Sequence, residues 1–131
     1  MERFIYIIDT GELYTDEGNY IGTGYAGKGA DKNNPNDDAV KGLGPLPDGD
    51  YQLSEPFTDE EKGPLVFGLI PDPKNEMHHR GSFMIHGDSI KDPGNASEGC
   101  MVQDHNVRQY IKDSGCRQLT VVKTSTDYFQ D

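Results

Sequence analysis

Basic residues are scarce in this chain. Twelve Lys and Arg stand against 23 Asp and Glu, which gives a formal net charge of −11 over 131 residues. Such a surface repels the phosphates of nucleic acids and anionic lipids, and no basic patch interrupts it. We therefore expect neither a nucleic-acid partner nor a membrane partner. Acidity favours solubility in itself, although it would also suit a cationic partner.

Cysteines and long apolar runs are also few. Cys100 and Cys116 are too few for a disulfide framework, and we expect free thiols. The apolar run near the start, residues 4–8, is short, follows an acid at Glu2 and precedes no small-residue cleavage site, so we expect no signal peptide. No stretch approaches the length of a membrane span. These features fit a cytoplasmic protein or one exported without a cleaved leader.

The balance of residue types predicts a mainly β fold. Apolar residues make up 33% of the chain, whereas 16 Gly and 8 Pro favour many turns and short strands over a helical bundle. The length suits a single domain over residues 1–131 with one core. Loops are expected over residues 26–44 and 58–62, and a polar tail over 124–131. Strands are expected over residues 3–8, 12–15, 20–25, 51–54, 65–70, 82–86 and 118–123.

A single segment, residues 104–114, has the pattern of a helix. Asp104 can serve as its N-cap, and Val107 and Ile111 recur at helical spacing. Gly115 follows at the position where a left-handed residue commonly ends a helix. We therefore expect one helix, near the C-terminal end of the domain.

Two residues with nucleophile and base chemistry follow the strand expected over 82–86. His86 ends this strand, and Cys100 comes fourteen positions later, directly after Gly99. A thiol reacts as its thiolate, which a neighbouring histidine can generate, and a glycine turn can direct backbone N–H groups at an oxyanion. Each residue alone fits a structural role, as a buried thiol or a hydrogen-bonded imidazole. Together they favour a Cys100 nucleophile with a His86 base, in the opposite chain order to papain-like hydrolases.

Adjacent histidines at positions 78 and 79 raise zinc binding as an alternative. In that hypothesis His86 and Cys100 would be ligands of a zinc-dependent hydrolase. A zinc site needs three or four ligands in a set geometry, and neighbouring residues of an extended segment point in opposite directions. We therefore expect no metal and no other cofactor.

The motifs around His86 and Cys100 resemble a known enzyme family. Residues 85–88 followed by 97–102 are similar to the signature of YkuD-type L,D-transpeptidases, in which a histidine precedes Ser/Thr-x-Gly-Cys. The resemblance covers about residues 20–112. Further blocks are similar to the short, leaderless branch known as type VI secretion L,D-transpeptidase effectors: residues 24–29, 32–35, 44–51 and 80–88.

This resemblance implies a fold, a reaction and a setting. The fold would be a YkuD-like catalytic domain, a small β-sandwich or barrel-like sheet with one helix after the catalytic cysteine. The substrates would be peptidoglycan stem peptides, whose terminal D-alanine is removed by hydrolysis or exchanged for a D-amino acid. The protein would be an antibacterial effector, made in the cytoplasm and secreted to act in the periplasm of a target bacterium. A secretion-system component and an immunity protein would be its partners. A non-catalytic cell-wall-binding or phage-associated module of the same fold remains the alternative.

The resemblance also implies roles for individual residues. Cys100 would be the nucleophile and His86 the base, with the imidazole oriented by the Gly87 carbonyl or by Asp88. Ser97, together with the residues up to the cysteine, would shape the oxyanion and substrate site.

Further positions around the site carry open alternatives. Gly99 belongs to the turn before the cysteine, and Glu98 stands where many YkuD-type enzymes have histidine. Glu98 would hold the loop, contact an ammonium group, or simply lie in solvent. Asn33 and Asn34 would line the substrate groove or serve ordinary turns, and Tyr25 would face the groove or pack in the core.

Overall fold

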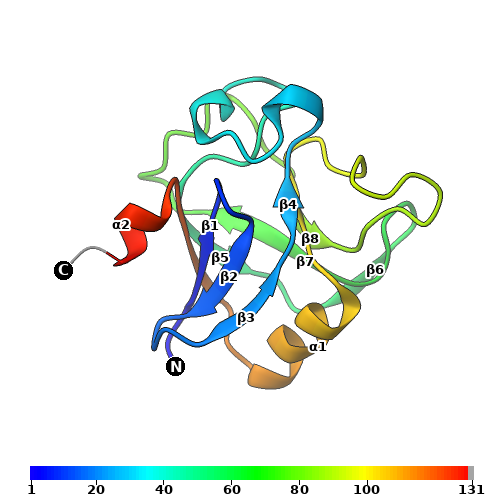
Figure 1. The fold of residues 1–131 in the computed structure, drawn as a ribbon. Coiled ribbons are helices and arrows are strands. Elements are labelled where there is room, and N and C mark those ends of the chain that lie inside the picture. The colour runs from blue at the N-terminus through cyan, green and yellow to red at the C-terminus, as the bar shows by residue number, and fades with distance from the viewer. Residues whose placement is uncertain (130–131) are drawn as a thin grey trace.

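Strands dominate the computed structural model, which describes residues 1–129 (Figure 1). The predicted mainly β class is confirmed. Helices are few: α1 (His105–Ser114), α2 (Ser125–Phe129) and two 3-10 turns, Gly29–Asp31 and Pro35–Asp37. The strands are β1 (Phe4–Ile7), β2 (Glu12–Thr15), β3 (Tyr20–Thr23), β4 (Tyr25–Ala26), β5 (Gly49–Leu53), β6 (Phe57–Asp59), β7 (Gly63–Pro71), β8 (Met84–His86), β9 (Met101–Val102) and β10 (Gln118–Val122).

The sheet closes on itself like a small barrel. Its strands follow the order β3-β2-β1-β10-β5-β7-β8-β9-β4, and β6 pairs with β7 outside this path. β3 and β4 stand at opposite ends of the order, yet in the chain they are separated by Gly24 alone. The Gly24 position has no room for a side chain, because a Cβ there would overlap the Val102 carbonyl oxygen. One bent segment thus supplies both ends of the sheet.

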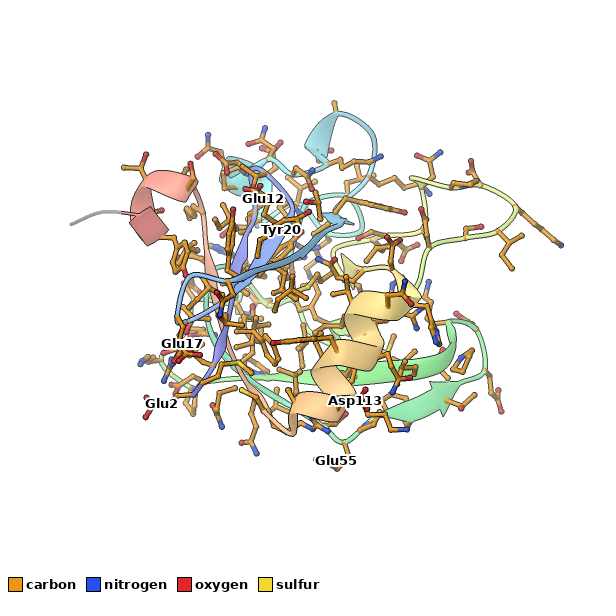
Figure 2. The ribbon with its side chains drawn as sticks, turned by 60° about the horizontal axis from the view of Figure 1, so that its bottom comes forward. Glu2, Glu12, Glu17, Tyr20, Glu55 and Asp113 are labelled. Carbon is orange, nitrogen blue, oxygen red and sulfur yellow. The ribbon has the colours of Figure 1, made fainter. Side chains whose placement is uncertain are left out.

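The core lies inside this curved sheet and is closed on one side by α1. Tyr6, Leu13, Phe67 and Ile85 are fully or almost fully buried, and Ile111 of α1 joins the same cluster. Burying such side chains contributes about 1.5–3 kcal/mol each. Most charged residues lie on the outside, Asp38 and Arg108 being buried, and Figure 2 shows Glu2, Glu55 and Asp113 projecting outward from separate parts of the chain.

The predicted helix over residues 104–114 is confirmed as α1. Gly115 takes the left-handed conformation, with φ 73°, and its N–H donates to the Lys112 carbonyl. Asp104 occupies the N-cap position, but its side chain makes no capping hydrogen bond. The end of the helix was therefore predicted for the right reason, whereas the capping bond expected at its start is not formed.

The expectation of a single helix is wrong, because α2 forms in the predicted polar tail. The Asp127 carboxylate accepts hydrogen bonds from the N–H and the hydroxyl of Thr124, both at 3.2 Å, and so caps the helix. Thr124-x-x-Asp127 is the sequence signal that was missed. The Tyr128 hydroxyl then donates to the Thr15 carbonyl at 2.8 Å, which fastens α2 to the sheet. Residues 130–131 of the predicted tail lie outside the described residues.

The loop predicted over residues 58–62 is also shorter than expected. Its first two residues belong to β6, where Phe57 pairs with Val66 and Asp59 with Gly63 across a β-bulge. Within residues 1–129, no helix has the length and apolarity needed to cross a membrane.

Candidate active site

The pairing of β8 with β9 brings Cys100 and His86 to one place. The two strands run parallel, with Ile85 opposite Met101. Cys100 and Met84, each one residue earlier, therefore become neighbours, and the Met84 N–H donates to Cys100 Sγ at 3.3 Å. The fourteen-residue separation in sequence is spanned by the loop at the right of Figure 1.

His86 is held in a single tautomer by the backbone next to it. Its Nδ1 lies 2.8 Å from the Gly87 carbonyl oxygen. A carbonyl can only accept a hydrogen bond, so Nδ1 carries the proton and Nε2 of the neutral ring carries the free lone pair. Nε2 is buried and makes no hydrogen bond with the described residues. The ring therefore presents an oriented proton acceptor with unused bonding capacity.

Cys100 and His86 line the same cavity, whose volume is about 460 Å³. Burial raises the pKa of the Cys100 thiol above its ordinary value, although the Met84 N–H acts in the opposite direction. Burial likewise lowers the pKa of His86 below 6.5. Both groups are thus neutral at pH 7, and the arrangement suits a histidine that takes the thiol proton during attack rather than a preformed ion pair.

Ser97 builds the turn that presents Cys100. Its side chain is completely buried. The hydroxyl accepts from the N–H groups of Gly27, at 2.8 Å, and Gly99, at 3.0 Å, and it donates to the Cys100 carbonyl at 2.7 Å. The Gly99 N–H is thereby already engaged within the turn. Gly99 itself has φ 135°, and a Cβ there would stand 2.6 Å from Arg80.

Asp88 binds the neighbouring loop instead of His86. Its carboxylate accepts from the Tyr25 hydroxyl at 2.6 Å and from the N–H groups of Ser89 and Gly94 at 2.8 and 3.1 Å. Of the two predicted partners for the imidazole, the structure selects the Gly87 carbonyl. Burial and the bond to Asp88 raise the pKa of Tyr25 to about 12, and this side chain fastens the loop rather than lining the Cys100 cavity.

Asn33 and Asn34 are not brought to the cavity. The Asn33 side chain accepts from the Ala26 N–H at 3.0 Å, and the backbone N–H of Asn33 donates to the Ala26 carbonyl at 2.8 Å. Asn34 caps the second 3-10 turn by accepting from the Asn36 N–H at 3.1 Å. Both asparagines serve turn geometry, which is the alternative that the sequence had left open. Glu98, in contrast, is exposed and lines the cavity beside Cys100.

Arg80 is a residue near the site that sequence analysis missed. Its two Nη atoms donate four hydrogen bonds of 2.6–3.1 Å to the carbonyls of Asp38, Pro45, Gly44 and Glu98. The guanidinium also stacks over Phe83, 5.0 Å from the ring centre. These contacts tie the long polar loop to the turn that ends at Cys100. The available signal was its place at the start of the block 80–88 that carries the family resemblance.

Arg108 was missed as well. It is 7% exposed, and it donates to the carbonyls of Gln103, Pro64 and Leu65 at 2.9–3.0 Å. It also packs against Gly87, where a Cβ would stand 2.6 Å from its guanidinium. The available signal was its place on the buried side of the helix, beside Val107 and one turn before Ile111.

A second cavity of about 690 Å³ adjoins the first. It lies between Asp88 and Arg108, and both cavities are lined by Glu61, Lys62 and Glu98. Of the adjacent histidines, His79 lines the Cys100 cavity, whereas His78 lies 3.4 Å from the Asp38 carboxylate. Among residues 1–129, no three His, Cys, Asp or Glu side chains gather in a metal-binding arrangement.

Residues 21–126 match the family model of the Tlde1 domain. The chain belongs to the Tlde1 domain family. The matched range includes His86, Cys100 and both arginines described above, and membership supports an effector of type VI secretion. Searches of curated proteins and of solved structures returned no match to this Tlde1 domain. Its likeness to YkuD-type enzymes therefore stays a prediction from the motifs.

Proposed function

We propose that this Tlde1 domain is a cysteine-dependent peptidoglycan L,D-carboxypeptidase that also acts as an L,D-transpeptidase. The observation that carries the proposal is the His86 geometry: Nδ1 is bonded to the Gly87 carbonyl, Nε2 has no hydrogen-bond partner among the described residues, and the residue lines the cavity that also contains Cys100. Membership of the family supports an antibacterial effector of type VI secretion, and the proposal adds that it acts in the periplasm of the target cell.

Acylation begins with proton transfer. His86 Nε2 takes the proton from Cys100 Sγ as the sulfur attacks the carbonyl carbon at the L-centre of the third stem residue. The resulting oxyanion is stabilised by the Cys100 N–H, since the Gly99 N–H is engaged by Ser97. The carbon–nitrogen bond then breaks, and the leaving D-alanine takes the proton from Nε2. A thioester on Cys100 and free D-alanine are the products of this step.

Deacylation uses the same imidazole. In hydrolysis, Nε2 takes a proton from water as the hydroxide attacks the thioester, and the thiol leaves with that proton. In exchange, the amine of a D-amino acid attacks instead and gives a proton to Nε2. The carbon–sulfur bond then breaks, a new amide bond remains, and the thiol leaves with that proton. The role of His86 in both directions requires a ring that is neutral at rest, as its lowered pKa provides. A secretion-system component and an immunity protein complete the proposed partners.

Incubation with purified disaccharide-tetrapeptide, followed by mass spectrometry, tests the proposal. The wild type is expected to remove one D-alanine, and Cys100→Ser to lower the rate at least about 1000-fold. Cys116→Ser is the matched control, because Cys116 lines neither cavity. Addition of a D-amino acid tests exchange. A wild-type protein that leaves the tetrapeptide intact, or a Cys100→Ser protein with full activity, would contradict the proposal.

A further inference from the structure

The turn between β6 and β7 places a lysine at the boundary of the two cavities. Lys62 is half-buried and lines both of them. The Asp59 carboxylate accepts from the N–H groups of Glu61, at 3.0 Å, and Lys62, at 2.9 Å, and so holds the turn. The backbone that carries the lysine is therefore ordered at the side of the cavity that contains Cys100.

The chain that follows this turn is also held in place, by hydrogen bonds from α1. Arg108 bonds the carbonyls of Pro64 and Leu65 at 2.9 and 3.0 Å. Leu65 takes a left-handed backbone conformation, with φ 59°, which is unfavourable for a branched apolar residue. The hydrogen bonds from a buried arginine compensate for that cost and keep the start of β7 in place.

Three cations line the Cys100 cavity, and they differ in what they can still bind. All four Nη hydrogens of Arg80 are donated to backbone carbonyls. Lys41 is exposed and belongs to the polar loop that lines the cavity. Lys62 is half-buried and makes no ion pair with the described residues. Lys62 lines the same cavity as His86 and Cys100, and its positive charge lowers the pKa of both groups.

We propose that Lys62 binds the free C-terminal carboxylate of the peptide substrate and so makes the enzyme selective for the last residue of a stem. The inference rests on the proposed function. In a substrate that loses its last residue, the free carboxylate of that residue lies directly beyond the bond to be cleaved. This carboxylate would enter a cavity lined by Glu61 and Glu98, in a protein of net charge −11. Such an anion needs a cation with free N–H donors, and Lys62 supplies three.

Kinetics with two matched peptides test this role. The first is a tetrapeptide stem that ends in D-alanine as the free acid, and the second is the same stem with a C-terminal carboxamide. Lys62→Met is expected to raise the KM for the acid about 10-fold or more while kcat changes little, and to abolish the preference for acid over amide. Lys62→Arg is expected to retain that preference. Lys112→Met, on the exposed end of α1, controls for the loss of one positive charge.

A binding measurement separates this inference from the proposed reaction. Calorimetry with Cys100→Ser protein measures binding without turnover. This protein is expected to bind the acid more tightly than the amide, and the double variant Cys100→Ser/Lys62→Met is expected to bind both equally. This result would stand even if the wild type cleaved neither peptide, in which case the proposed function alone would fail. Equal binding of acid and amide, no binding of the acid, or a preference abolished by Lys41→Met instead of Lys62→Met would overturn the inference.

Discussion

The two adjoining cavities differ in the hydrogen-bonding capacity that their central polar groups leave unused. In the first, which Cys100 also lines, His86 Nε2 is buried without a hydrogen-bond partner among the described residues. In the second, the Asp88 carboxylate accepts from three groups and the Arg108 guanidinium donates to three carbonyls. Polar groups that are satisfied inside the protein hold its shape, whereas a buried group with spare capacity can act on a substrate.

Gly87 connects the two cavities. Its carbonyl accepts from His86 on one side, and its Cα faces the Arg108 guanidinium on the other. The satisfied network of the second cavity therefore supports the geometry of the first. The variants below separate these two contributions.

Among the variants that compare the two cavities, removal of the imidazole is expected to have the largest effect. His86→Ala deletes the proposed proton acceptor and should lower kcat for D-alanine release about 100- to 10 000-fold. The rate is measured by mass spectrometry of the tetrapeptide product. His105→Ala is the control, because His105 is exposed at the start of α1. Comparable loss in the two variants would show that the effect does not come from His86 chemistry.

Acidification is expected to remove activity through the same group. Burial lowers the pKa of His86 from 6.5, so the ring stays neutral until the pH falls below that value and activity should decline there. The unfolded chain takes up this proton at higher pH than the folded one. The His86 contribution to stability is therefore complete above pH 6.5 and is lost as the pH falls toward the lowered pKa. A pH–rate profile of kcat/KM measures the effect, and a decline centred above pH 6.5 would contradict it.

Disruption of the second cavity is expected to lower the free energy of unfolding more than it lowers the rate of the reaction. Arg108→Leu leaves the carbonyls of Gln103, Pro64 and Leu65 without their donor, and should lower the free energy of unfolding by about 3 kcal/mol. Urea titration measures this loss. Lys112→Leu, an exposed change on the same helix, should stay within about 0.5 kcal/mol of the wild type. Equal stability of the two variants would show that Arg108 does not hold this region together.

The smallest effect on activity is expected from Asp88. Asp88→Ala removes the acceptor for Tyr25, Ser89 and Gly94, and should lower the free energy of unfolding by about 1 kcal/mol. Because the Gly87 carbonyl orients His86, kcat should remain close to that of the wild type. A loss of 100-fold or more in kcat, without unfolding, would instead make Asp88 an orienting residue of the site.

Much of the fold followed from local patterns. The strands that contain residues 4–7 and 84–86 and the helix over 105–114 were predicted because β-branched runs, helical spacing and Gly115 act over a few residues. α2 was missed because its capping residues, Thr124 and Asp127, lie in a segment whose composition is polar. The pairing of distant strands, and with it the barrel-like closure through Gly24, depends on contacts that local pattern does not encode.

The sequence by itself determined which residues carry reactive chemistry: a histidine at a strand end, a thiol after a glycine turn, and their order. The tertiary structure decided what each of them contacts. It selected the Gly87 carbonyl over Asp88 as the partner of His86, and it engaged the Ser97 hydroxyl within the turn. The physical reason is that a side chain can satisfy its hydrogen bonds with many neighbours, and the packing of segments far apart in sequence determines which neighbour is within reach.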